Sequence, residues 1–142
     1  MRMRAFSGAA PQSTPFSFSE FGRRAGRERG KYLATQIIID AVARAFIISP
    51  LQLTARSRGP ASVALARQTA MYLAHVVLGL SYTRAGRLFG RDRTTVAHAC
   101  RLVEEMRDDA AFDTRLDALE RALRARNELT CMLRDACSGV LR

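Results

Sequence analysis

A short polar run, Arg91–Thr95, has the residue types and the spacing best suited to binding chemistry in this chain. It follows Gly90 and precedes an amphipathic segment, so we expect it to form the first turn of a helix. Backbone N–H groups at a helix start attract phosphate, and threonine suits phosphate or thymine. Aspartate can accept from cytosine N4, and arginine can donate to guanine. The run therefore fits a helix that reads the major groove of DNA.

A structural explanation accounts for the same residues. In this explanation Asp92 is merely an N-cap, Thr94 and Thr95 are ordinary first-turn residues, and His98 is a solvated surface residue. The spacing of these residues does not decide between DNA reading and a purely structural role. The elements on either side of the run therefore have to be considered as well.

The chain before this run is expected to form helices. A 3.6-residue apolar stripe predicts a helix from Tyr32 to Ile48, and Ser49 followed by Pro50 predicts a short helix through about Leu53. The segment Arg56–Pro60 is a basic loop that no helix can cross. Ser62 is expected to cap the following helix, which runs to about Leu78.

Glycine and serine set the boundaries around the polar run. Gly79 ends the helix before it, and Ser81 caps a short helix over Tyr82–Phe89. Gly90 makes the turn, and the next helix runs from near Asp92 to about Arg107. Two short helices joined by a glycine turn are the arrangement of a helix-turn-helix.

A last helix is predicted from about Asp113, and it can continue through Leu133 and Ala136 to a stop at Ser138 and Gly139. No segment alternates as a strand would. We expect an all-α, compact multi-helix domain that contains a helix-turn-helix, with a disordered basic N-terminal arm. The ranges are 1–30 for the arm, 31–125 for the domain and 126–142 for a C-terminal helical extension.

Charge is distributed unevenly along the chain. The net charge is +10, and residues 1–101 hold 16 basic and 4 acidic residues, against 7 and 9 from residue 102 onward. One end is therefore suited to a polyanion, and double-stranded DNA is the first partner to consider. A basic protein on an anionic membrane surface is the alternative, although no apolar run approaches a membrane span.

Cysteine and histidine patterns favour no catalytic or metal chemistry. Cys100, Cys131 and Cys137 form no CxxC pair, and His75 and His98 lack zinc-finger spacing. We read the cysteines as reduced thiols in a cytoplasm, with Cys100 as a small core residue. Paired carboxylates and a nucleophile with its base are also missing, so we expect no enzyme, no cofactor and no metal.

The first residues allow two interpretations. Arg2 and Arg4 among several serines loosely resemble an organelle transit peptide, but the apolar region of a secretory signal is missing. A disordered basic arm is the simpler interpretation, because Pro, Gly, Ser and Arg cannot bury enough surface to order themselves. The run Gly26–Lys31 lacks the spacing of a nucleotide-binding loop.

The string GRDRTTVAHAC, from Gly90 to Cys100, resembles the signature of the C-terminal DNA-binding domain of the bacterial replication initiator DnaA. The string ARQTAMYLAH, from Ala66 to His75, is similar to the helix before it. A weaker match extends back through Ile37–Leu53 and forward to about Glu120. Nothing in residues 1–61 resembles that family's ATPase domain.

The resemblance implies a helix in the major groove and a basic loop in the adjacent minor groove. Asp92, Arg93 and Thr94 would then read bases, and Arg56 or Arg58 would enter the minor groove. Phosphate contacts would come from residues on three helices: Arg67, Gln68, His75, Tyr82, Thr83, Arg91, Thr95 and His98.

Three positions depart from the family pattern. Arg93 stands where the initiator usually has histidine, His75 replaces a frequent lysine, and the turn between Phe89 and Arg91 is one residue shorter. Arg93 and the shortened turn fall where the DNA box is read, so the preferred box can differ.

Two functions follow as expectations. The first is a stand-alone, sequence-specific DNA-binding protein in the bacterial cytoplasm, associated with the nucleoid, which regulates transcription or replication initiation by occupying initiator-like boxes. The alternative is a helical protein-interaction adaptor that has lost specific DNA reading. Its partner, or a second copy in a homodimer, would bind the C-terminal helix.

Overall fold

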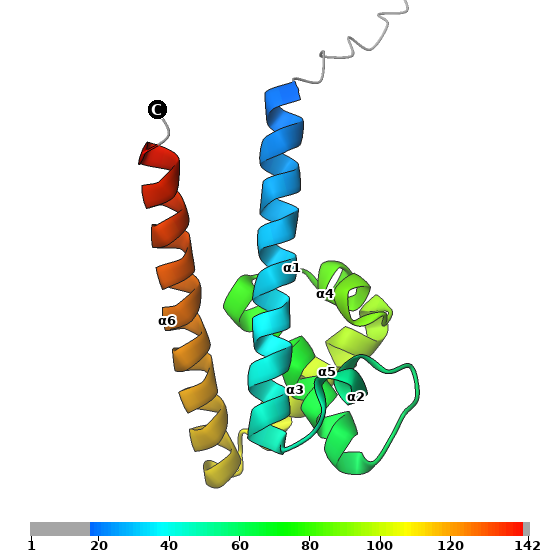
Figure 1. The fold of residues 1–142 in the computed structure, drawn as a ribbon. Coiled ribbons are helices and arrows are strands. Elements are labelled where there is room, and N and C mark those ends of the chain that lie inside the picture. Colours follow the sequence, from blue (N-terminus) through cyan, green and yellow to red (C-terminus); the bar gives the residue numbers. More distant parts are fainter. Residues whose placement is uncertain (1–17, 141–142) are drawn as a thin grey trace, which may run out of the picture.

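The computed structural model describes residues 18–140, and within them the side chains of residues 24–139. The described part of the chain forms six helices and no strand, which confirms the all-α class. The helices are α1 (Phe18–Phe46), α2 (Pro50–Thr54), α3 (Ala61–Leu78), α4 (Tyr82–Phe89), α5 (Arg93–Met106) and α6 (Ala110–Val140) (Figure 1).

Helix α3 lies at the centre of the domain. It packs against each of the other five helices, and its residues from Thr69 to Ala74 are all buried. The fully buried side chains around it come from five helices and one loop, including Ile38, Val42, Leu53, Leu80, Val96 and Val103. A helix that is apolar almost all round is stable only when it is enclosed in this way.

Helix α1 differs from the predicted range at both ends. It begins at Phe18, so residues 18–30 of the expected arm are helical, while residues 1–17 of the arm lie outside the described residues. An ion pair between Glu28 and Arg84 holds this part of α1 against α4. The helix ends at Phe46 because Ile47 takes a left-handed conformation at φ 56°. Such a conformation is strained for a β-branched residue.

Most of the predicted helix boundaries are confirmed. Ser49 and Gln52 form a capping box at α2, and Ser81 caps α4. Gly79 and Gly90 end α3 and α4 at φ 63° and 62°. The prediction that Ser62 caps α3 is wrong, because the helix already begins at Ala61, two residues before the predicted start. Its first carbonyl acceptor is Pro60, which binds Ala64 N at 3.0 Å, and no side chain caps this end.

Helix α6 is continuous through the range predicted for its extension. Its first turn is capped by the Asp109 carboxylate, which accepts from the backbone nitrogens of Ala111 and Phe112. Arg107, at the end of α5, donates to Asp113 and Glu120 of α6 at 2.7 and 2.8 Å, and to the Tyr72 hydroxyl of α3 at 2.8 Å. Burial raises the pKa of Tyr72 to about 12. Beyond this junction, α1 and α6 extend together past the core (Figure 1).

Candidate nucleic-acid interface

The turn between α4 and α5 is set by close backbone packing. Arg91 N donates to Gly86 O at 2.8 Å, so the chain doubles back on the last turn of α4. A Cβ added at Gly86 would lie 2.5 Å from Arg91 O, so only glycine allows this approach. Gly90 supplies the left-handed residue at the corner. These two glycines fix the direction in which α5 leaves the turn.

Asp92 is the N-cap of α5. Its Oδ1 accepts from Thr95 N at 2.7 Å, and this backbone hydrogen bond, with one from the Thr95 side chain, lowers the pKa of Asp92. The carboxylate is therefore ionised at neutral pH and oriented by the helix start. The capping explanation of Asp92 is confirmed, and base reading by the same side chain remains a prediction.

The structure gathers most of the predicted DNA-contact residues around one surface depression of about 600 Å³, which we call the basic hollow. Its walls come from the loop after α2, from α3 and from the start of α5. They are lined by Arg56, Arg58, Ala64, Arg67, Gln68, Met71, Arg91, Asp92, Thr94, Thr95 and His98. The basic hollow therefore brings the loop arginines, distant in sequence, next to the polar run.

Arg67 holds the basic loop instead of facing solvent. It is only 6% exposed. Its guanidinium donates to Leu53 O and Gln52 O at 2.8 Å each. Longer bonds reach Ser57 O and Arg58 O at 3.2 and 3.4 Å. Burial, together with the nearby charge of Arg91, lowers the pKa of Arg67.

The predicted phosphate contact of Arg67 stays a prediction, and the structure gives the residue a different role. The donors of its guanidinium are directed at backbone carbonyls within the chain, and the residue acts by positioning the loop. A sequence signal was present, because Arg67 falls at helical spacing with the buried Val63, Ala70 and Ala74.

Arg91 ties the same loop to the helix-turn-helix. Its Nη2 donates to Ala55 O at 2.7 Å and its Nη1 to Arg56 O at 3.3 Å. The side chain is half-buried, so part of it still faces the basic hollow. Sequence reasoning missed this link because the two partners are 35 and 36 residues away, with no local pattern between them.

His75, Tyr82 and Thr83 lie outside the basic hollow, at the corner between α3 and α4. His75 Nδ1 lies 2.6 Å from Leu80 O, and its ring centroid is 4.6 Å from that of Tyr82. Thr83 is exposed in the first turn of α4. This corner is a second candidate site for phosphate contact. His75 also links α3 to the loop before α4 through its contact with Leu80 O.

Arg93 is exposed at the first position of α5 and does not line the basic hollow. His98 is exposed one turn further along, where its Nδ1 lies 3.3 Å from Arg101 Nη2. Arg93, Thr94, Thr95 and His98 thus present four polar side chains on the solvent side of α5, whose other side packs through Val96, Ala99 and Val103.

Cys100 belongs to the core, as predicted. Burial raises its thiol pKa to about 11, while Cys131 and Cys137 are exposed. Within the described residues, no three His, Cys, Asp or Glu side chains are grouped to hold a metal ion. No helix in the described range is long and apolar enough to cross a membrane.

The fold and the site together define a helix-turn-helix domain. Residues 35–103 match the family model described as the bacterial dnaA protein helix-turn-helix. This stretch of the chain is a helix-turn-helix domain of that family, which confirms the resemblance of its signature strings.

Curated relatives agree with this assignment. The chain is 42% identical over 105 residues to the chromosomal replication initiator protein DnaA of Thermomicrobium roseum, covering 72% of this chain and 21% of that protein. It is 34% identical over 91 residues to DnaA of Lachnoclostridium phytofermentans, covering 63% and 20%. The chain thus spans about a fifth of the length of these relatives.

Two solved structures have a similar fold. One is described as a DNA replication initiation factor, with a TM-score of 0.66 and 29% identity over 77% of this chain and 33% of that chain. The other is a replication initiator DnaA bound to AMPPCP and single-stranded DNA, with a TM-score of 0.64 and 28% identity over 78% and 33%.

Proposed function

We propose that this chain binds double-stranded DNA in a sequence-specific manner and acts by binding, not as an enzyme. The observation that carries the proposal is the basic hollow, which joins Arg56 and Arg58 to the exposed start of α5. The major groove admits one helix, and an adjoining arginine loop suits the narrower minor groove. The match of residues 35–103 to the DnaA helix-turn-helix family supports the same function.

Each side chain takes a role that its position allows. Asp92, Arg93 and Thr94 read base edges, and Arg56 or Arg58 enters the minor groove. Gln68, Thr95 and His98 contact phosphates around the basic hollow, with Arg91 contributing from its exposed part. Further phosphate contacts come from the α3–α4 corner through His75, Tyr82 and Thr83. By occupying initiator-like boxes, the chain would regulate transcription or replication initiation.

Binding should depend strongly on salt. The logarithm of the affinity for duplex DNA is expected to fall linearly with the logarithm of the salt concentration, because each neutralised phosphate releases counterions. Replacing Arg56 and Arg58 together by alanine should weaken binding and reduce the magnitude of this slope by about 1 or more. Fluorescence anisotropy with labelled duplexes, in salt steps, measures both quantities.

Arg115→Ala is the control, because Arg115 is exposed on α6 and its replacement removes a charge away from the basic hollow. It should leave the slope unchanged. Equal slopes for all three proteins, together with equal affinity for every duplex sequence, would contradict the proposal and favour the protein-interaction adaptor.

A further inference from the structure

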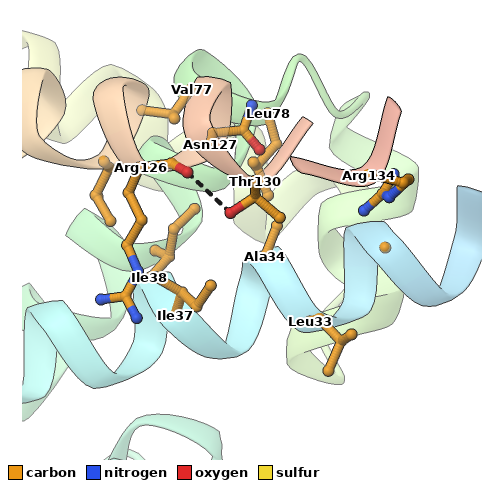
Figure 2. Close-up of a pocket in the computed structure, with 12 residues that line it drawn as sticks. Leu33, Ala34, Ile37, Ile38, Val77, Leu78, Arg126, Asn127, Thr130 and Arg134 are labelled. Atoms are coloured by element: carbon orange, nitrogen blue, oxygen red, sulfur yellow. Dashed lines mark hydrogen bonds between the residues drawn. The ribbon is translucent and has the colours of Figure 1, made fainter. Parts of the chain in front are cut away.

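Helix α6 has one face that its own chain covers. Leu116 and Leu123 are buried in the core, and beyond them Asn127, Thr130 and Arg134 line the small cavity between α6 and α1. Figure 2 shows these three side chains above Ala34, Ile38 and Leu33 of α1. The inward face of the distal half of α6 is therefore polar and faces α1 across this cavity.

A different face of α6 is apolar and exposed along its length. Six exposed residues follow one another at intervals of four, three, four, three and four positions: Ala118, Ala122, Ala125, Leu129, Met132 and Ala136. At 100° per residue, this row lies roughly 150° around the helix from the inward face. Intervals of three and four are the heptad pattern of a coiled-coil seam. We call this row the α6 seam.

We propose that the α6 seam binds the α6 seam of a second copy of this chain, with the two helices antiparallel. In that orientation Leu129 meets the partner's Ala125, and Met132 meets the partner's Ala122. Ala118 then meets the partner's Ala136. Each large side chain faces a small one, which allows close packing. A parallel pair in register would instead stack alanine on alanine in four of the six layers and leave voids.

Charge also favours this partner. The stretch 117–136 of α6 has four basic and four acidic residues, so two copies do not repel each other through it, although the whole chain carries +10. In the antiparallel pair, Arg121 lies beside the partner's Asp135. Both residues are at positions that flank the seam, where coiled coils form salt bridges between helices. The exposed part of α1 holds Arg24, Arg27 and Arg29, which disfavours pairing of two copies through α1.

The seam continues into an apolar groove of about 490 Å³ at the base of α6. Ala118 and Ala122 line it with Phe46 of α1, Leu65 of α3 and Phe112. Antiparallel pairing places the partner's helix end, just beyond the partner's Ala136, at this groove. The same pairing therefore covers both the α6 seam and this groove. Helix α6 lies on the side of α1 away from α2 (Figure 1), and the groove shares no lining residue with the basic hollow.

Sedimentation equilibrium of the full chain without DNA tests the pairing. Wild type is expected to give twice the monomer mass at micromolar concentration. Met132→Glu should dissociate at least tenfold more readily, because it places a charge in the seam. Cys131→Glu is the matched control, since the neighbouring Cys131 is exposed but lies off the seam. Circular dichroism should show both variants folded. A monomeric wild type, or equal behaviour of the two variants, would overturn the proposal.

Crosslinking tests the orientation. In a background with Cys131 and Cys137 replaced by serine, the double variant Ala122→Cys with Met132→Cys should form covalent dimers under mild oxidation. Neither single cysteine should do so, because residue 122 faces residue 132 of the partner and not its own equivalent. Efficient crosslinking by either single variant would indicate parallel pairing and overturn the antiparallel arrangement.

Discussion

Arg67→Met should lower the free energy of unfolding by roughly 2–4 kcal/mol, because it leaves several buried or partly buried carbonyls without their donor. Methionine keeps most of the apolar volume, so the effect isolates the lost hydrogen bonds. The carbonyls of Leu53, Gln52 and Ser57 would lose the guanidinium that orients them. Urea unfolding followed by circular dichroism measures the change.

DNA affinity should fall as well, on all sequences alike, because the loop that presents Arg56 and Arg58 would no longer be held. Arg56→Met is the matched control: it removes an exposed arginine of the same loop and should weaken DNA binding with little change in stability. If Arg67→Met proved as stable as wild type and lost only affinity, the residue would be a phosphate contact after all.

Gly86→Ala should destabilise the helix-turn-helix by about 1–3 kcal/mol, which is typical of overpacking against atoms that cannot move away. The added Cβ would lie 2.5 Å from a backbone oxygen, that of Arg91, and not from a flexible side-chain end. Relief of the contact has to shift the start of α5, so DNA affinity should fall with stability. Thermal unfolding and anisotropy titrations measure the two effects.

Gly26→Ala provides the same chemical change in open surroundings. A Cβ at Gly26 meets nothing within 4 Å, and alanine is the better helix former, so stability should be unchanged or rise by up to about 1 kcal/mol. We therefore expect Gly86→Ala to lower the free energy of unfolding and Gly26→Ala to leave it unchanged or raise it. Similar small gains at both positions would show that the α4–α5 turn adapts without cost.

Sequence patterns predicted the caps and turns because those depend on residues close in the chain. Ser49, Ser81, Gly79 and Gly90 act within a few residues of themselves, and each has the expected place. The start of α1 was missed because its evidence is distant. Glu28 pairs with Arg84, 56 residues away, a contact that no local sequence pattern predicts.

The apolar stripe predicted for α1 ran through Leu33, Ile37 and Ile38, and only part of it faces the core. Ile37, Ile38 and Ile39 are consecutive, so periodicity could not select the inward one. In the structure Ile38 and Ile39 are buried with Val42, whereas Leu33 is 56% exposed. Where apolar residues run together, packing against α3 decides which side faces the core.

The structure brings most of the predicted DNA-contact residues around the basic hollow, and it gives Arg67 and Arg91 partners within the chain that the sequence did not predict. Charge and family pattern favour phosphate for any arginine near the signature. Arg67 and part of Arg91 instead bind backbone carbonyls of the loop. Residue type alone could not distinguish an arginine that meets DNA from one that holds the loop meeting DNA.

If the start of α5 reads base edges, Arg93→Ala should lower the ratio of specific to non-specific DNA affinity. Preferred duplexes are first selected from random DNA with the wild-type chain. The affinity for the best site is then divided by that for a scrambled duplex at one salt concentration, for wild type, Arg93→Ala and Arg115→Ala. Arg93→Ala should lower the ratio by an amount equivalent to about 1–3 kcal/mol, while Arg115→Ala should leave it unchanged. An unchanged ratio in Arg93→Ala, or no sequence preference in the wild type, would contradict base reading by the start of α5.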